Sequence, residues 1–488
     1  MYFKGRTVFA FVMVTIIASV LVTMTLADQW MQGGHQRSSS AVVAAAAGDD
    51  QARYQLNADE LAKLNAVLEL IETKYYADVE REELLDGAVS GMMSALDDPY
   101  SVYMEKEVAQ HFAESIEGSF TGIGAEVTKE DGKIIVVSPI KGSPAERSGL
   151  LAKDVLISIN GVSLNGLNLQ EAVTKIRGPK GTKAKIVVQR NGFAEPIQLV
   201  LIREDIDVET VHSTMRPDGI GVIEIRQFSL NTSKRFKEEL VKLEGEGLKG
   251  LVLDVRNNPG GVLPIVVEIS QLMMKEGSTV VQVEYRDGKR DKTLAKGGSQ
   301  KDYPIAVLTN KGSASASEIL AGALQEAAGA TVIGEQSFGK GTVQVSYNKA
   351  LGDGSLVKMT IAKWLTPNGN WIHKKGITPN QIVDPPDMYT VARMNVQEPL
   401  KADSLSEQVR SAQIMLHGLG FEPSREDGYF DTETVEAVKK FQAQHQLPAT
   451  GEIDAKTAVL LEQAVVKWIQ NKENDAQLLE AVKAVSRK

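Results

Sequence analysis

Two short apolar runs place the tightest constraint on the fold of this chain. Gly250–Val255 and Ile305–Leu308 have the length of single strands and almost no polar side chains, and helical stretches stand between them. A strand that is apolar on both faces belongs in a sheet covered by helices on both sides. We therefore predict an α/β domain over residues 205–386, within a multidomain chain of mixed α/β class.

Length and composition narrow the class of protein further. The chain has 488 residues, which suggests about three domains, and its content of 43% hydrophobic and 24% charged residues is typical of folded protein. Its net charge of -9 argues against nucleic acid as a partner. Cysteine is absent, so disulfides, thiolate metal sites and a cysteine nucleophile are excluded. Because there is no zinc-spaced His/Glu motif and no phosphate-loop glycine pattern, we expect no cofactor and no metal.

The N-terminus carries the signal for location. Lys4 and Arg6 precede an uncharged apolar run from Val8 to Ala27, close to the roughly 20 residues that cross a bilayer. The positive flank predicts that the start of the chain stays inside. Residues 1–27 are either an uncleaved signal anchor, which suits this length, or a signal peptide, for which Thr25-Leu26-Ala27 is a poor cleavage site. Both interpretations put the rest of the chain outside the cytoplasm, membrane-anchored or secreted.

Two segments follow the apolar run. Residues 28–53 are rich in Gln, Ser, Ala and Gly and are predicted to form a stalk linker. Residues 54–110 carry apolar side chains at helical spacing, which predicts two amphipathic helices joined near Asp78 and ended by Asp97-Asp98-Pro99-Tyr100. So short a helical pair buries little by itself, and we expect it to pack on another subunit or on the main domain.

Residues 111–204 combine short strands with one helix. The pattern predicts a helix over 169–176 and strands over 134–137, 155–159, 185–189 and 198–201. The segment resembles a PDZ domain through the order of Thr121-Gly122-Ile123-Gly124, Gly142-Ser143-Pro144-Ala145, Asp154-Val155-Leu156 and Ile159-Asn160-Gly161.

The PDZ resemblance implies a peptide-binding loop. In that family, backbone N–H groups of a glycine-containing loop hold a peptide's terminal carboxylate, and the peptide adds as a strand. The positions implied here are Thr121, Gly122, Ile123 and Gly124, where the two glycines allow close approach. Arg177, at the end of the predicted helix, is either an ordinary solvated charge or a residue that senses bound peptide or faces the neighbouring domain.

A segment of small residues precedes another predicted helix. It reads Gly312-Ser313-Ala314-Ser315-Ala316-Ser317-Glu318-Ile319-Leu320. A serine at a helix N-terminus lies where backbone N–H groups and the helix dipole favour negative charge. An ordinary N-cap serine has the same appearance, so this segment alone leaves both interpretations open.

A second segment supplies a candidate base. Lys340 stands between two glycines in Phe338-Gly339-Lys340-Gly341. A serine hydroxyl needs a base to become a nucleophile, and a lysine can serve when burial lowers its pKa toward neutrality. None of the six histidines lies in either segment. A Ser–His–Asp triad would have to recruit His212 or His373, and neither has a supporting pattern.

Four features together resemble the C-terminal processing peptidases, also called tail-specific or carboxyl-terminal proteases. They are the two segments above, the PDZ-like domain ahead of them, and the run Asp254-Val255-Arg256-Asn257-Asn258-Pro259-Gly260-Gly261. The resemblance covers roughly residues 60–385.

This resemblance assigns roles to individual residues. It implies that Ser315 is the nucleophile, Lys340 the general base and Gln344 the group that orients the lysine amine. Ser313 and Ser317 compete with Ser315, and the family's spacing to Lys340 selects the middle serine. An oxyanion hole is implied at the N–H of Ala316 and one N–H in the Gly260-Gly261 turn.

The last domain is small. Residues 405–466, reached through a linker at 387–404, resemble the three-helix peptidoglycan-binding domain through Leu419-Gly420-Phe421, Asp427-Gly428-Tyr429-Phe430-Asp431 and Thr450-Gly451. The resemblance implies peptidoglycan as a partner, with a purely structural module as the alternative. We expect Phe421, Phe430 and Phe441 to be core residues, and residues 467–488 to form a charged tail that is helical or frayed.

The resemblance, together with the N-terminal segment, implies a bacterial extracytoplasmic serine endopeptidase that cleaves proteins near their C-termini. Expected partners are protein or peptide substrates with free C-termini, peptidoglycan, and the membrane through residues 1–27; a homodimer is also compatible with the resemblance. The alternative is a non-catalytic scaffold with PDZ-like and wall-binding adaptors. Such a scaffold would not need Ser315, Lys340 and Gln344 together.

Overall fold

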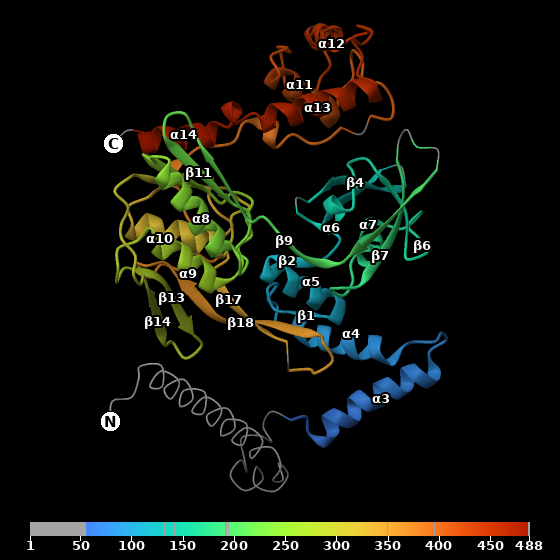
Figure 1. Cartoon of the computed structure of the whole chain (residues 1–488), viewed down its shortest axis with the longest axis vertical. Helices are drawn as coiled ribbons and strands as arrows, with labels where there is room; N and C mark the ends of the chain where they lie inside the picture. The colour runs from blue at the N-terminus through green and yellow to red at the C-terminus, as the bar shows by residue number, and fades with distance from the viewer. Residues whose placement is uncertain are drawn as a thin grey trace, which may run out of the picture. The chain divides into compact units, whose positions relative to one another are not determined.

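The computed structural model describes residues 55–486, apart from residues 131, 141, 191, 192, 194, 349 and 395. The predicted signal segment 1–27 and the predicted stalk 28–53 therefore lie outside the described residues. The chain divides into two compact units, residues 1–91 and 92–488, which are taken in turn (Figure 1).

The described part of the first unit is helical. Helix α3 (Ala58–Lys74) begins with a capping box in which Asn57 and Glu60 accept each other's backbone amides, and α4 (Arg81–Ser94) follows it. Neither helix contains a buried residue. The two predicted helices are confirmed, and the surface on which they pack stays a prediction. Among the described residues, no helix has both the length and the apolar content needed to span a membrane.

A six-stranded sheet forms the centre of the second unit. Its strands run in the order β10 (Val211–Met215), β11 (Ile220–Ile225), β12 (Gly250–Asp254), β15 (Ile305–Thr309), β16 (Thr331–Gly334) and β19 (Gln381–Ile382). All neighbours are parallel except β10 with β11. Every residue of β12 and β15 is buried, which confirms the prediction made from their apolar runs.

Helices cover both faces of this sheet. Leu251, Leu253 and Val307 belong to a core shared with α8 (Thr232–Gly245), α9 (Leu263–Gln271) and α10 (Ala316–Ala327). The alternate residues Val252, Ala306 and Leu308 belong to a second core, built with α14 (Ala476–Ser486). Because successive side chains of a strand point to opposite faces, the two cores lie on opposite sides of the sheet.

Helix α14 confirms the helical alternative for the predicted tail at residues 467–488, but this helix packs on the sheet and is not a free charged end. Figure 1 shows α14 beside β11, and its side chains Leu478, Ala481, Val482 and Val485 are buried against the sheet. These positions recur at helical spacing, so the amphipathic signal was present in the sequence. The charged residues occupy the other side of the helix, where Lys483 pairs with Glu480.

A second, antiparallel sheet lies beside the first. Strands β1 (Val102–Met104), β18 (Leu356–Leu365), β13 (Thr279–Tyr285) and β14 (Arg290–Leu294) pair in that order, and β17 (Thr342–Tyr347) also pairs with β18. The strand β1 lies near the end of the predicted helical segment 54–110, so the last part of that segment contains a strand as well as helices and pairs with β18.

The PDZ-like segment has its own sheet and core. Strands β3 (Ala125–Glu130), β4 (Lys133–Pro139), β5 (Val155–Ile159), β7 (Lys183–Gln189) and β8 (Ile197–Ile202) pair in that order, with β6 (Val162–Ser163) added to β5. These bounds match the predicted strands closely, and α7 (Leu169–Ile176) matches the predicted helix. A ribbon of β2 (Ser119–Gly122) and β9 (Glu204–Asp207) joins the two ends of the segment, and α5 (Lys106–Glu117) precedes it.

Three helices make up most of the C-terminal module. They are α11 (Glu407–Gly418), α12 (Thr432–Gln444) and α13 (Ala455–Gln470). Phe430 and Phe441 are fully buried and Phe421 is packed against the same core, so the prediction that these rings are core residues is confirmed.

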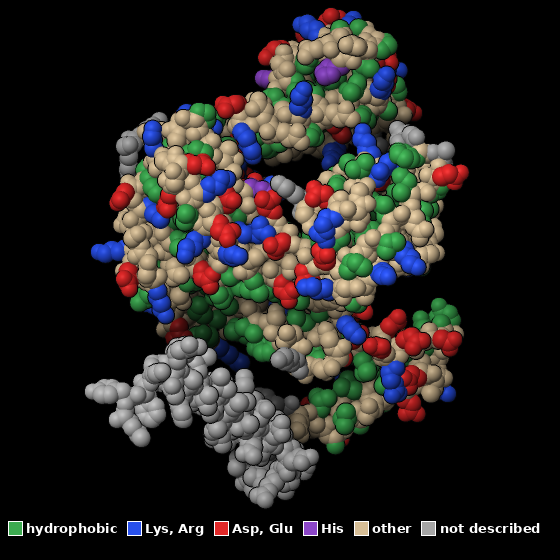
Figure 2. Space-filling model, in the orientation of Figure 1, with side chains coloured by type: hydrophobic (Ala, Val, Ile, Leu, Met, Phe, Trp, Pro, Cys, Tyr) green, Lys and Arg blue, Asp and Glu red, His purple; other side chains and the backbone are tan. Residues whose placement is uncertain are grey.

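Charges of both signs share the surface of the second unit. On the face in Figure 2, Lys and Arg side chains are interspersed with Asp and Glu side chains. No single sign of charge therefore dominates this face.

Candidate active site

The three segments singled out in the sequence meet at one edge of the central sheet. They follow β12, β15 and β16, which are parallel, so all three leave the sheet at its carboxyl end. The Ala314 amide donates to the Asn258 carbonyl at 3.0 Å, and the Phe338 amide donates to the Ser313 carbonyl at 3.0 Å. Ligand sites of open α/β sheets lie at this edge.

The structure separates the three serines of the motif. Ser313 is fully buried and its hydroxyl donates to the Val255 carbonyl at 2.8 Å. Ser317 is also fully buried and donates to the Asn258 carbonyl at 2.9 Å. Ser315 is only half-buried, and it stands at the N-cap of α10 in a capping box with Glu318. Unlike the other two hydroxyls, its hydroxyl donates to no acceptor among the described residues. Ser315 is therefore the serine whose hydroxyl is available for chemistry.

Ser315 has an unusual backbone. Its φ of 55° is positive, which is rare for a residue with a side chain, and it stands immediately before α10. Strain of this kind persists only where the surroundings enforce it, and it concentrates at functional sites. The helix N-terminus behind Ser315 favours negative charge near its hydroxyl.

Glu318 ties the serine segment to the lysine segment. Its side chain is fully buried. One oxygen, Oε2, accepts from the Ser315 amide at 2.8 Å and from the Lys340 amide at 2.9 Å. The other oxygen accepts from the Gly339 amide and the Ser337 hydroxyl, both at 2.6 Å. The amide nitrogens of Ser315 and Lys340 thus share one acceptor atom.

Two tryptophan indoles bind the backbone carbonyls of the lysine segment, whereas Glu318 binds its backbone amides. Trp364 donates from Nε1 to the Lys340 carbonyl at 2.7 Å, and Trp371 donates from Nε1 to the Gly341 carbonyl at 2.8 Å. Sequence reasoning identified neither tryptophan and gave Glu318 no role. Glu318 could have been identified from the sequence, because it stands inside the serine motif. The two tryptophans could not, because they come from β18 and the loop after it.

The Lys340 amine lies in a place suited to a neutral base. The pKa of Lys340 is lowered from 10.5 to about 8, mainly by burial and also by the nearby charge of Lys358, while Glu318 and Asp98 oppose the shift. Its Nζ lies 5.0 Å from the centre of the Tyr100 ring. Ser315 and Lys340 do not hydrogen-bond each other directly, and contacts of this kind often tighten only when substrate is present.

Gln344 lies four residues further on, in β17. Its Nε2 donates to the hydroxyls of Thr342 at 2.9 Å and Thr360 at 3.1 Å. These two bonds fix the orientation of the amide, so the carbonyl oxygen is the atom left to accept a hydrogen bond from another group.

The glycine pair packs directly against the serine. A Cβ added at Gly260 would lie 2.9 Å from the Ala316 nitrogen and 2.9 Å from the Ser315 Cβ, so only glycine fits. The Gly260 amide itself donates to the Asn258 side chain at 2.9 Å. Within the described part of the chain, the amides of Gly261 and Ala316 donate to no protein acceptor. Of the predicted oxyanion donors, these two are therefore the free ones.

Neither candidate histidine contacts Ser315. His373 stacks on Trp371 with ring centroids 5.2 Å apart, and its Nδ1 accepts from the Gly341 amide at 3.4 Å. His212 lies on β10, 3.7 Å from Glu209. The described residues thus give no support to a Ser–His–Asp arrangement.

The predicted peptide-binding loop lies beside an unpaired strand edge. Strand β3 is the last strand of the PDZ-like sheet, and α7 packs against it. Gly124, just before β3, has a φ of +76°, and a Cβ there would lie 2.3 Å from the Ser143 Cβ. An extended peptide can add to an edge of this kind.

Arg177 is not a freely solvated charge. Its guanidinium pairs with Glu114, bonds His111 Nδ1 at 2.9 Å and lies 4.8 Å from the Phe120 ring centre. These contacts tie the end of α7 to α5. The side chains of Arg177 and its partners, together with Val173, line a hollow of about 360 Å³.

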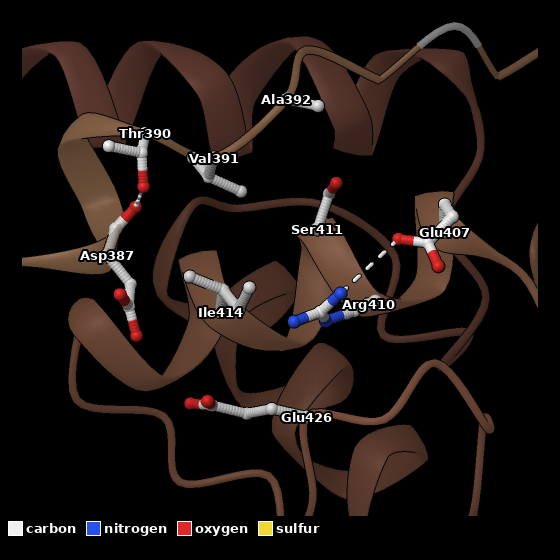
Figure 3. Close-up of a pocket in the computed structure, with 9 residues that line it drawn as sticks. All are labelled: Asp387, Thr390, Val391, Ala392, Glu407, Arg410, Ser411, Ile414 and Glu426. Atoms are coloured by element: carbon white, nitrogen blue, oxygen red, sulfur yellow. Dashed lines mark hydrogen bonds and ion pairs between the residues drawn. The ribbon is translucent and has the colours of Figure 1, made fainter.

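Another hollow, of about 270 Å³, lies in the C-terminal module where residues 387–392 pass α11. Figure 3 shows Arg410 paired with Glu407 at one side and Glu426 below them. The buried Ser411 side chain points into the same space. Among the described residues, no cluster of His, Cys, Asp and Glu could hold a metal ion.

Family models match four parts of the chain. Peptidase family S41 matches residues 219–383 and the PDZ domain matches 135–190. The N-terminal domain of the activating protease CtpB matches 17–108, and the peptidoglycan binding domain matches 406–461. These ranges follow the order of the segments predicted from the sequence.

Known proteins match over most of their length. The carboxy-terminal processing protease CtpB of Bacillus subtilis (strain 168) is 47% identical over 87% of this chain and 88% of its own. CtpA of the same organism is 42% identical over 87% of this chain and 90% of its own. Among solved structures, the photosystem II D1 C-terminal processing protease matches 67% of this chain and 94% of its own, with 28% identity and a TM-score of 0.40.

Proposed function

The chain belongs to the carboxy-terminal processing proteases of peptidase family S41, and on this premise we propose that it is a serine endopeptidase that uses Ser315 and Lys340. The observation that carries the proposal is the bond set of Glu318. A single buried carboxylate holds the backbone of a half-exposed serine and of a lysine with a lowered pKa. A non-catalytic scaffold would have no use for this arrangement.

In the proposed reaction, neutral Lys340 removes the proton of Ser315 Oγ as that oxygen attacks the scissile carbonyl carbon. The amides of Ala316 and Gly261 hold the oxyanion of the tetrahedral intermediate. The Lys340 ammonium then protonates the leaving amine, and the peptide C–N bond breaks. Water attacks the acyl-enzyme with Lys340 again acting as base, which releases the new C-terminus and restores Ser315. Gln344 orients the lysine amine through its carbonyl oxygen.

The proposed substrates are proteins with a free C-terminus, cut near that end. The support comes from the unpaired edge of β3 and from Gly122 and Gly124 before it, which suit an added peptide strand and its terminal carboxylate. Thr121, Ile123 and Arg177 complete the proposed peptide-binding residues.

The proposed location is outside the cytoplasm, with residues 1–27 as a signal anchor or signal peptide. The support is the positive flank and the apolar length of that segment. Peptidoglycan is a proposed partner of residues 405–466, favoured by the open polar hollow at Arg410 (Figure 3). Co-sedimentation with purified sacculi, compared between wild type and Arg410→Ala, tests that partner separately from proteolysis.

Cleavage of an unfolded protein by the purified full chain tests the main proposal. Ser315→Ala and Lys340→Ala should each abolish cleavage with the fold intact, and the double variant should match either single one. Lys311→Ala is the matched control, because Lys311 is 84% exposed in its side chain and should be dispensable. Substantial cleavage by folded Ser315→Ala protein would rule the proposal out.

A paired substrate tests recognition of the C-terminus. The same peptide is supplied with a free or an amidated C-terminus, and the amidated form should be cut markedly more slowly. Equal rates for the two forms would leave the Ser–Lys assignment standing and remove the proposed role of the PDZ-like loop.

A further inference from the structure

Arg256 has no role in the proposed reaction, yet its guanidinium makes a full set of hydrogen bonds. It lies between β12 and the Gly260-Gly261 turn, and its side chain is 13% exposed. Its Nε and Nη2 donate to Asp254 at 2.9 and 2.6 Å. Its Nη1 and Nη2 donate to Asp475 at 2.9 and 2.7 Å, and Nη1 also donates to Gln477 at 2.9 Å. All five N–H donors of the guanidinium are therefore occupied.

Two of the three partners come from the far end of the chain. Asp475 and Gln477 stand at the start of α14, and Asp475 is 219 positions from Arg256. The Asp475 side chain is only 6% exposed and also accepts from the Leu478 amide at 3.0 Å. The apolar side of α14 is buried in the sheet, so this helix is a fixed support rather than a loose end.

The turn after Arg256 is the one that presents the free Gly261 amide. The chain from Asp254 to Gly261 is attached to the serine segment at Asn258, which accepts from Ala314 and Ser317. Arg256 is the point at which the same turn is attached to α14. A planar guanidinium held by two carboxylates has a defined position and orientation, which a single ion pair would not give.

Gln477 reaches the lysine side of the site as well. Its Nε2 donates to the Val383 carbonyl at 2.7 Å and would lie 3.5 Å from a Cβ on Gly334. Gly334 ends β16 and begins the segment that leads to Lys340. The first residues of α14 therefore contact the approaches to both halves of the site.

We propose that Asp475 and Gln477 are positioning residues for catalysis, which hold the Gly261 amide toward the oxyanion by fixing Arg256. They touch neither substrate nor the reacting atoms. This inference rests on the proposed function, and it adds that the last helix of the chain contributes to the rate of the chemical step.

The test compares Asp475→Ala and Asp475→Asn with wild type in peptide cleavage. Asp475→Ala should lower kcat about 10- to 100-fold, the scale of a misplaced catalytic group, with KM changed by less than about twofold. Asp475→Asn keeps the shape of the side chain and one acceptor oxygen, so its kcat should lie between those of wild type and Asp475→Ala. Lys483→Ala is the control on the same helix, since Lys483 is 61% exposed in its side chain and should leave kcat unchanged.

Active-site titration with a phosphonylating reagent separates positioning from loss of fold. Positioning predicts that every Ser315 is labelled, at a lower rate constant, with the pH dependence of wild type. A merely structural role predicts fewer labelled sites, each reacting at the wild-type rate constant. That result, or a wild-type kcat in Asp475→Ala, would overturn the proposal. An inactive wild type or an active Ser315→Ala variant would instead overturn the proposed function.

Discussion

Lys340, the proposed general base, has a lowered pKa because its amine is poorly solvated. Burial disfavours its charged form, and Lys358 adds repulsion, so the pKa falls to about 8. Glu318 and Asp98 pull the other way and keep the shift moderate. The backbone of Lys340 is fixed by Glu318 and Trp364, so the amine cannot escape to solvent by moving the chain.

The pH dependence of cleavage follows from this pKa. Only neutral Lys340 is a base, so kcat/KM should rise about tenfold per pH unit below pH 8 and level off above it. Lys358→Met removes a repelling charge and should move the midpoint to higher pH. A midpoint near the ordinary histidine value of about 6.5 that disappeared in His373→Ala would contradict the lysine assignment.

The same shift predicts a stability effect at Lys340. The folded protein releases this proton at a lower pH than the unfolded chain, so the charged lysine destabilises the fold below pH 8. Lys340→Met should therefore be inactive but more stable at pH 7, on the order of 2 kcal/mol after allowance for partial exposure. The gain should shrink between pH 8 and 10.5, as the unfolded chain also loses the proton. Urea unfolding of wild type and Lys340→Met at pH 7 and at pH 10.5 measures this gain in stability. A variant that is less stable than wild type at pH 7 would contradict the prediction.

At the scale of elements, the proposed peptide site consists of strand β3 and the loop before it. The loop is held at Gly124, whose carbonyl accepts from the Ser143 hydroxyl at 2.8 Å. Two glycines of the same φ, +76°, flank β3: Gly124 has Ser143 against it, and Gly132 has nothing within 4 Å. They form a matched pair for testing what the close contact contributes.

Gly124→Ala should weaken binding of a peptide with a free C-terminus, because the new methyl group must displace Ser143 and reshape the loop. Both Gly124→Ala and Gly132→Ala suffer the cost of a positive φ, roughly 1 kcal/mol. Only Gly124→Ala should also lose peptide affinity, by about tenfold or more. Fluorescence anisotropy with a labelled peptide and thermal unfolding measure the two effects, and equal affinity in both variants would contradict the assignment of the loop.

At the scale of the whole molecule, the chain returns to its core domain after the C-terminal module. Helix α14 follows α13 of that module and covers one face of the central sheet. The module at residues 405–466 is therefore an insertion between two parts of the core domain, β19 and α14, rather than an appended end.

Removal of residues 475–488 should destabilise the protein although it spares every proposed catalytic residue. Leu478, Val482 and Val485 are nearly fully buried, and their loss amounts to on the order of 5 kcal/mol. That is comparable to the total stability of a typical domain, about 5–15 kcal/mol. Denaturant midpoints and binding of a hydrophobic dye measure the effect, with removal of residues 487–488 alone as the control. An unchanged midpoint in the longer truncation would contradict the role given to α14.

The sequence by itself determined most of the elements and the short motifs. Strand and helix bounds follow from local periodicity, which the backbone imposes on neighbouring residues, and β12, β15 and α7 appeared as predicted. The motif residues at Ser315, Lys340 and Gly260-Gly261 were identifiable for the same reason, since each motif occupies a few consecutive positions. The spacing of Leu478, Ala481, Val482 and Val485 was equally local, and it was overlooked beside the charges around it.

Only the tertiary structure decided which residues share an environment. The family's spacing had already favoured Ser315, but the physical difference between the three serines appears only in the fold, where Ser313 and Ser317 are buried and donate to the Val255 and Asn258 carbonyls. The lowered pKa of Lys340 is a property of its surroundings, contributed by segments that include Asp98, Lys358 and Glu318. The bonds between Arg256 and Asp475 join positions that are 219 residues apart in the sequence. Contacts of this kind arise when the sheet brings distant strands to one edge, and no local pattern records them.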